Sequence, residues 1–263
     1  MIHQLSCVHP DAQIGENVII EPFVNIAKDV IIGDGTRVMS NAVIMEGARI
    51  GKNCTIFPCA VISGHPQDLK FDGEYTTVEI GDNTTIRECV TINRGTKAKT
   101  KTIIGNNCMI MACAHIAHDV RIGNNCVIVS HSGLAGEVEV DDCAIIGGGT
   151  LIHQFVRIGA HVMIAGASKV RKDVPPYVKA ARDPLAYAGV NSVGLRRRGF
   201  PNEKIWEIQD IYRELYQKDM NNTEALKYIE DNYPQSEERD IVINFVRGSK
   251  RGIMKGYEQI DED

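Results

Sequence analysis

The chain has 263 residues, of which 43% are hydrophobic and 24% charged, and its formal net charge is −5. This is the composition of a globular protein with a sizeable core, and the acidic balance gives no reason to expect nucleic acid as a partner. The first residues lack a basic stretch followed by an apolar run, and no segment approaches the roughly 18 uninterrupted apolar residues of a membrane span. We therefore expect a cytoplasmic protein with no membrane span.

A period of six residues dominates the sequence. From Val8 to Val170, Ile, Leu or Val occupies almost every sixth position, with interruptions at Asp68, Glu74 and Ala98. Neither the helical period of 3.6 nor the alternation of an ordinary strand produces this spacing, so the repeat itself is the structural unit. If each hexapeptide is a short strand plus a turn, three of them close a triangular coil, and stacked coils form parallel strands. The repeat thus predicts a mainly β fold, a parallel β-helix rather than a generic β-rich domain.

Two stretches, near 63–79 and 93–103, interrupt the repeat, which then resumes in the same phase. Both stretches must leave the stack of triangular coils and return to it, so we expect them to be inserted loops. Loops on a rigid scaffold tend to carry binding groups. The repeat stops at the paired prolines that follow Val170. We assign residues 1–190 to the β-helix and 191–263 to a small helical domain, because the period becomes helical there. The apolar positions of the three expected helices are Ile205, Ile208, Ile211, Tyr212 and Leu215 in the first, Leu226 and Ile229 after Thr223 in the second, and Ile241, Ile243, Phe245 and Val246 in the third.

The glycines and cysteines follow the same period. Glycine recurs directly after the apolar column, as at Gly33 and Gly51, where a Cβ would be costly at a tight corner. The cysteines fall into two phases and form no Cys-x-x-Cys pair, so we expect structural thiols rather than disulfides or metal ligands. The two sets are Cys54, Cys108 and Cys126, and Cys59, Cys89, Cys113 and Cys143.

The densest cluster of titratable side chains is His115-Ile116-Ala117-His118-Asp119. With 18 residues per coil, His118 should lie beside Gly136, which lies beside Gln154, and Asp119 should lie next to Glu137. A histidine oriented by a carboxylate is suited to act as a base near neutral pH. A neighbouring glycine offers its backbone N–H to an oxyanion. His118, Asp119 and Gly136 are therefore the candidate catalytic residues.

Other uses of these residues remain open. His118 is alternatively an exposed turn histidine with no chemical role. Three imidazoles, His115, His118 and His131, would also suit zinc, although the spacing does not fix their orientation. The basic run Arg196-Arg197-Arg198 would hold a phosphate through paired N–H groups or simply be solvated.

Several motifs together carry a specific resemblance that extends over nearly the whole chain. They are Gln67-Asp68-Leu69-Lys70, Thr91-Ile92-Asn93-Arg94-Gly95-Thr96, the His115–Asp119 cluster, Ala144-Ile145-Ile146-Gly147-Gly148, His153-Gln154-Phe155 and Gly194-Leu195-Arg196-Arg197-Arg198-Gly199-Phe200. With these motifs the chain resembles the acyl-carrier-protein:UDP-N-acetylglucosamine O-acyltransferase family. The resemblance implies a left-handed parallel β-helix, an exception to the usual right-handed crossover, assembled as a homotrimer with active sites between subunits.

The resemblance also implies a reaction and a set of roles. An (R)-3-hydroxyacyl group passes from acyl carrier protein to the 3-hydroxyl of UDP-N-acetylglucosamine, the first step of lipid A synthesis. The residue matching the family's general base is His118, supported by Asp119, with Gly136 as oxyanion donor. No cofactor or metal is implied, because the donor is carried on the phosphopantetheine of the carrier protein. Substrate-binding positions in the same sense are Gln67, Asp68, Lys70, Asn93, His115, Glu137, His153, Gln154, Asn191, Arg197 and Arg198, and Gly166 matches the position that measures acyl length, where a small residue predicts a long chain.

Three positions depart from the family pattern. Asn93 and Glu137 stand where similar proteins carry histidine, and Val193 stands where an acidic residue is expected near the uridine. Glu137 beside Asp119 should raise the proton affinity of the carboxylate pair and of His118. We therefore expect the affinity for the substrate or the pH optimum to differ from those of similar proteins.

Three competing functions remain to be separated. An N-acyltransferase on a glucosamine derivative typically has an additional N-terminal domain, whereas here the repeat begins by Val8. A β-helical zinc hydrolase of the carbonic anhydrase type would contain stoichiometric zinc, and a non-catalytic scaffold would be indifferent to loss of His118. The basic tail residues Lys250, Arg251 and Lys255 are either solvated or steer an acidic carrier protein.

Overall fold

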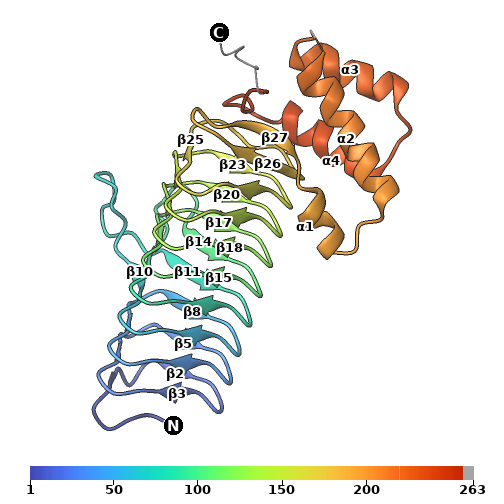
Figure 1. The fold of residues 1–263 in the computed structure, drawn as a ribbon. Coiled ribbons are helices and arrows are strands. Elements are labelled where there is room, and N and C mark those ends of the chain that lie inside the picture. The colour runs from blue at the N-terminus through green and yellow to red at the C-terminus, as the bar shows by residue number, and fades with distance from the viewer. Residues whose placement is uncertain (219, 257–263) are drawn as a thin grey trace.

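The structure is a computed structural model that describes residues 1–218 and 220–256. Stacked triangular coils form a long prism, and a group of helices lies at its C-terminal end (Figure 1). The prism is a left-handed parallel β-helix with one parallel sheet on each of its three sides, as the hexapeptide period and the resemblance predict.

Each of the eight coils from β1 to β24 gives one strand to each sheet. Sheet 1 contains β1 (Cys7–Val8), β4 (Asn25–Ile26), β7 (Val43–Ile44), β10 (Val61–Gly64), β13 (Thr91–Asn93), β16 (His115–Ile116), β19 (Gly133–Leu134), β22 (Leu151–Ile152) and β25 (Lys169–Val170). Sheet 2 contains β2 (Gln13–Ile14), β5 (Ile31–Ile32), β8 (Ala48–Ile50), β11 (Thr77–Ile80), β14 (Lys101–Ile104), β17 (Arg121–Ile122), β20 (Glu139–Val140) and β23 (Arg157–Ile158). Sheet 3 contains β3 (Ile19–Ile20), β6 (Arg37–Val38), β9 (Thr55–Ile56), β12 (Thr85–Ile86), β15 (Met109–Ile110), β18 (Val127–Ile128), β21 (Ile145–Ile146), β24 (Met163–Ile164), β26 (Val178–Ala181) and the antiparallel β27 (Ala186–Val190).

The apolar column fills the interior of the prism. Its side chains are buried from Ile20 to Val170, and the strand pairing keeps them in register, as in the pair Ile116↔Leu134. Neighbouring coils pair residues 18 apart, for example His115↔Gly133. The steps Val61↔Thr91 and Thr91↔His115 are longer by 12 and 6 residues, because a loop leaves the prism in each. The predicted coil is confirmed; each of the two longer steps contains a segment outside the paired strands, and the loop that follows β10 stands out from the prism (Figure 1).

Glycines after the column are required by the neighbouring coil. A Cβ on Gly33 would lie 2.6 Å from the carbonyl carbon of Gly51, although Gly33 does not have a positive φ. The residues with a positive φ lie at other positions of the corners, for example two residues after Gly51. Non-glycine residues such as Asn53 (φ 53) and Cys59 (φ 62) occupy these positions. Close stacking of coils, rather than backbone conformation, therefore selects glycine at these positions.

The buried cysteines, Cys54, Cys108 and Cys126, act as hydrogen-bonding core residues. The Cys108 thiol donates to the carbonyl of Gly123 at 3.1 Å, and the Thr84 hydroxyl makes the equivalent bond to Gly105 at 2.9 Å. Burial raises the pKa of the Cys54 thiol, so it stays protonated near neutral pH. All eight cysteines are free, as expected of structural thiols.

Within residues 1–218 and 220–256, four helices follow the prism: α1 (Ser192–Arg197), α2 (Asn202–Gln217), α3 (Asn222–Asn232) and α4 (Glu237–Arg247). The expected apolar face of α2 is buried, whereas on α4 Ile241 is partly exposed and Val242 is buried in its place. The buried Asp173 ties the tail to the last coils, because it accepts from the Ser249 hydroxyl at 2.7 Å and from the Arg157 amide at 2.9 Å. Within the described residues, no helix has the length and apolar character needed to cross a bilayer.

Candidate active site

A cavity of about 450 Å³ lies on the outer face of sheet 1. The insertion after β10 contributes Gln67 to its wall, and consecutive coils contribute the rest. Its lining residues are Gln67, His115, Ala117, His118, Gly133, Leu134, Ala135, Gly136, Leu151, Ile152 and Gln154. The structure thus brings five of the predicted site residues together at one cavity: Gln67, His115, His118, Gly136 and Gln154.

His118 lies at the corner after β16 and is largely buried, with 8% of its surface exposed. Its Nδ1 is 2.9 Å from Oδ2 of Asp119. Because an ionised carboxylate only accepts hydrogen bonds, this contact assigns the proton of the neutral ring to Nδ1 and leaves the lone pair on Nε2. The ring is therefore prepared to take up a proton on the side of Nε2.

The carboxylate of Asp119 is buried and held by the second inserted loop. Its Oδ1 accepts from the Thr96 amide at 3.0 Å and the Lys99 amide at 3.3 Å, and its Oδ2 accepts from the Thr96 hydroxyl at 2.6 Å. The Asp119 amide donates to the Thr102 hydroxyl at 2.9 Å. The segment 93–103 therefore fixes the position of Asp119. The sequence analysis did not identify Thr96, Lys99 or Thr102 as the residues that hold Asp119.

Gly136 stacks directly against the His118 ring, as the coil arithmetic predicts. A Cβ at this position would lie 2.6 Å from both Cε1 and Nε2 of the imidazole. The amides on either side are bonded between coils, Ala135 N to Ile152 O and Glu137 N to His118 O, whereas no acceptor pairs with the Gly136 amide among the described residues. An N–H therefore remains available next to Nε2.

His115 stands beside this pair on the outer face of β16. Its Nδ1 is 2.7 Å from the Thr91 hydroxyl on β13. Burial lowers the pKa of the His115 imidazole, so it favours the neutral form near pH 7. A neutral, half-buried imidazole in the wall of a cavity is suited to hydrogen bonding rather than to charge pairing.

The loop residues Asp68, Lys70 and Asn93 are outside the lining of the cavity. Asp68 Oδ1 accepts from the Lys70 amide at 3.0 Å, which stabilises the turn after Gln67. Asn93 is buried, and its side-chain NH₂ donates to the carbonyl of His65 at 2.9 Å, while its Oδ1 has no hydrogen-bond partner among the described residues. Asn93 thus anchors the base of the first loop.

Three further predicted residues also lie outside the cavity. Glu137 is half-buried one coil beyond Asp119, as the arithmetic predicts, with its amide on the His118 carbonyl. His153 is exposed, and its Nδ1 is 3.3 Å from the Arg251 guanidinium of the tail. Gly166 is exposed after β24, where a Cβ would lie 3.1 Å from the carbonyl oxygen of Gly148.

The remaining predicted residues belong to the start of the helical domain. Asn191 is buried and caps α1, accepting from the Gly194 amide at 3.2 Å and donating to the His161 carbonyl at 2.9 Å. Arg197 and Arg198 are exposed on and after α1. Burial, reinforced by the Arg198 charge, lowers the pKa of His161.

The histidines proposed for zinc do not assemble. His131 lies at the corner before β19, whereas His118 lies at the corner after β16, at opposite ends of neighbouring strands. In the described part of the chain, no group of three or more His, Cys, Asp or Glu side chains is arranged to hold a metal ion.

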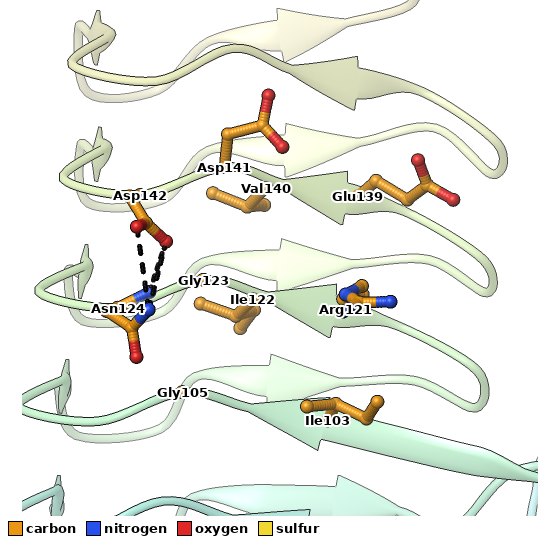
Figure 2. Close-up of a pocket in the computed structure, with 10 residues that line it drawn as sticks. All are labelled: Ile103, Gly105, Arg121, Ile122, Gly123, Asn124, Glu139, Val140, Asp141 and Asp142. Carbon is orange, nitrogen blue, oxygen red and sulfur yellow. Dashed lines mark hydrogen bonds between the residues drawn. The ribbon is translucent and has the colours of Figure 1, made fainter.

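A second depression, of about 570 Å³, lies on the outer face of sheet 2 (Figure 2). Its side chains pair across coils: the Asn124 amide donates to Asp142 at 2.7 Å, and Glu139 forms ion pairs with Lys99 and Arg157. These contacts pair Asp142 and Glu139 with neighbouring side chains of the prism wall, and they contain no base comparable to the His118–Asp119 pair.

Known proteins are similar to this chain over nearly its whole length. Residues 173–254 match the sequence family described as UDP N-acetylglucosamine O-acyltransferase, domain 2, and residues 101–136 match the bacterial transferase hexapeptide repeat. An acyl-[acyl-carrier-protein]–UDP-N-acetylglucosamine O-acyltransferase from Janthinobacterium sp. (strain Marseille) is 44% identical over 97% of this chain and 99% of its own. The chain belongs to this acyltransferase family.

Solved structures of the family have the same fold throughout. A UDP-N-acetylglucosamine acyltransferase from Bacteroides fragilis superposes with a TM-score of 0.96 at 52% identity, covering 97% of this chain and 100% of that one. The enzyme from Francisella novicida gives a TM-score of 0.94 at 40% identity, with 97% and 94% covered. The β-helix and the helical tail are therefore both features of the family.

Proposed function

We propose that this protein transfers an (R)-3-hydroxyacyl group from acyl carrier protein to the 3-hydroxyl of UDP-N-acetylglucosamine, the first step of lipid A biosynthesis. The observation that carries the proposal is the His118–Asp119 pair, with Nε2 against Gly136 at a cavity, in a chain that shares this family's fold from end to end. We place the reaction in the cytoplasm.

In the proposed mechanism, Nε2 of His118 removes the proton of the sugar hydroxyl as that oxygen attacks the thioester carbonyl. Asp119, fixed by its loop contacts, holds the ring in the required tautomer and stabilises the imidazolium. The Gly136 amide donates to the oxyanion of the tetrahedral intermediate. The imidazolium then returns the proton to the departing thiolate, so neither a covalent enzyme intermediate nor a cofactor of the enzyme is required.

We assign the other residues by their positions. Gln67, His115 and Gln154 line the cavity and would hold the sugar and the acyl hydroxyl. By the family resemblance, the residues outside the lining that would also contact substrate are Asp68, Lys70, Asn93, Glu137 and His153. Arg197 and Arg198 are exposed and would meet the nucleotide phosphates with α1, whose start Asn191 fixes. Gly166 leaves space beside Gly148, which favours a long acyl chain.

We propose that the enzyme acts as a homotrimer, and the outer faces of the sheets support this. On sheet 3, Met109, Val127, Ile145 and Met163 stack in register as a partly exposed apolar stripe. On sheet 2, the equivalent positions are charged, as in the series Arg121, Glu139 and Arg157. A contiguous apolar stripe on one face only is typical of a surface that a second copy covers.

The decisive experiment is incubation of the pure protein with UDP-N-acetylglucosamine and a series of 3-hydroxyacyl carriers, followed by mass spectrometry of the product. We expect a 3-O-acylated sugar nucleotide, with the highest yield for a long acyl chain. His118→Ala should lower the rate by roughly 10² to 10⁴, the range of general base catalysis, whereas His131→Ala, at an exposed corner, should leave it unchanged. An unaltered rate in His118→Ala, or no acylated product from the parent, would overturn the proposal.

A further inference from the structure

Three exposed cysteines lie at equivalent corners of the prism, each between a strand of sheet 3 and the next strand of sheet 1. They are Cys59 between β9 and β10, Cys89 between β12 and β13, and Cys113 between β15 and β16. Hydrogen bonds between coils join these corners: the Cys89 amide donates to the Pro58 carbonyl at 3.2 Å, and the Cys113 amide donates to the Glu88 carbonyl at 2.9 Å. The three residues therefore lie on consecutive coils, and we call them the cysteine column.

Burial does not explain why cysteine occupies these corners, because the three side chains are exposed. Their φ angles, 62°, 56° and 61°, are left-handed. For residues other than glycine this conformation costs free energy, and Asn, Asp and His adopt it most readily. The equivalent corners before and after the column follow this preference, with Asn41 and His131. Three consecutive cysteines at such a position therefore point to a role of the thiols themselves.

The spacing of the coils suits a disulfide between neighbours in the column. The strand residues that follow each cysteine by two positions are paired in register between coils. Neighbouring cysteines are thus separated by about the usual strand spacing of 4.8 Å, and the Cα atoms of a disulfide lie about 4.4 to 6.8 Å apart. Cys59 and Cys113 are two coil steps apart, or about 10 Å, which is too far for a disulfide. Any disulfide within the column must therefore include Cys89.

We propose that the cysteine column is a site of reversible oxidation, at which a peroxide converts Cys89 and Cys113 into a disulfide between two coils. The hydrogen bond between coils is shorter here than between the corners of Cys59 and Cys89, 2.9 Å against 3.2 Å, which favours Cys113 as the partner. Exposure and a second thiol beside the first are features of redox-sensing cysteines. In the cytoplasm, where we place this protein, such disulfides are usually transient. The proposal does not depend on the proposed function.

The reaction consumes one peroxide for each disulfide. The thiolate of one cysteine attacks a peroxide oxygen and the O–O bond breaks; with hydrogen peroxide the products are a sulfenic acid and hydroxide, which takes up a proton to become water. The thiolate of the other cysteine then attacks the sulfenic sulfur, the S–O bond breaks, and the oxygen leaves as a second water after taking up a proton. The two thiols lose two electrons, which the peroxide gains. A dithiol reductant reverses the reaction by thiol–disulfide exchange.

The test uses the full chain, first reduced and then exposed to hydrogen peroxide, with the free thiols alkylated by iodoacetamide before digestion and mass spectrometry. We expect a linked pair of peptides that contain Cys89 and Cys113, which dithiothreitol separates, and a loss of about two alkylated thiols per chain. Cys59→Ser should retain this link, whereas Cys89→Ser should abolish every disulfide within the column. The half-exposed Cys143 lies at a corner flanked by asparagine and histidine on the neighbouring coils, so it is the internal control and should appear in no disulfide.

Circular dichroism verifies that both serine variants remain folded. Oxidation of the column to sulfinic acids without a disulfide would overturn the proposal, as would a disulfide that joins two chains or one confined to the buried Cys108 and Cys126. A link from Cys89 to Cys59 in the parent would overturn Cys113 as the partner. A link from Cys59 to Cys113 in folded Cys89→Ser would refute the argument from spacing. None of these readouts depends on acyl transfer, so failure of this proposal is distinguishable from failure of the proposed function.

Discussion

Gly136→Ala tests whether the imidazole of His118 must lie flat against the next coil. The added Cβ would meet Cε1 and Nε2 of the ring at 2.6 Å. Carbon atoms in contact are normally about 3.5 to 4.0 Å apart, so the ring and the coil must separate by about 1 Å. A displacement of about 1 Å in a catalytic constellation costs on the order of 100-fold in rate, or about 2.7 kcal/mol. The backbone amide is retained, so the loss reports on the position of the ring.

The assay is kcat/KM with acyl carrier protein as donor and UDP-N-acetylglucosamine as acceptor, with thermal unfolding to verify that the coil is intact. Gly133→Ala is the matched control, because it lines the same cavity but its Cβ would meet only the flexible Leu151 side chain, at 3.1 Å. We expect little change in the control. Parent-like activity in Gly136→Ala would refute the reasoning, and equal losses in the two variants would attribute the effect to crowding of the cavity instead.

Two further predictions concern the loop and the pH dependence of stability. Thr96→Val removes the hydroxyl bond to Asp119 and should lower kcat about tenfold with little change in KM. Thr96→Ser should restore the rate. Thr100→Val is the control and should not lower the rate, because among the described residues the Thr100 hydroxyl bonds only to the adjacent Lys99 carbonyl. Burial and Arg198 lower the pKa of His161, so the unfolded chain binds its proton more readily and stability falls as the pH drops below about 6.5. The decline of Tm between pH 7 and pH 5 should be shallower in His161→Gln, and an identical slope would contradict this origin.

The contacts of the catalytic pair divide into predictable and unpredictable parts. Gly136 beside His118 was predictable, because a strict repeat fixes which residues stack once the coil length is known. Thr96 on Asp119 was not, because its loop has no period and its path depends on contacts that the repeat does not specify. The hydrogen bond from Asn93 to the His65 carbonyl was not predictable either, because it also depends on the path of a loop. The family resemblance assigns Asn93 to substrate binding.

By itself, the sequence determined the β-helix, its register and the two excursions, because one inward-facing apolar residue per six leaves a single way to bury the column. It also determined which columns meet at the cavity. The tertiary structure alone decided how the loop from 93 to 103 returns to hold Asp119, and how Ser249 of the tail reaches Asp173 on the last coils. These features arise from contacts between segments far apart in the chain, whose geometry no local periodicity encodes.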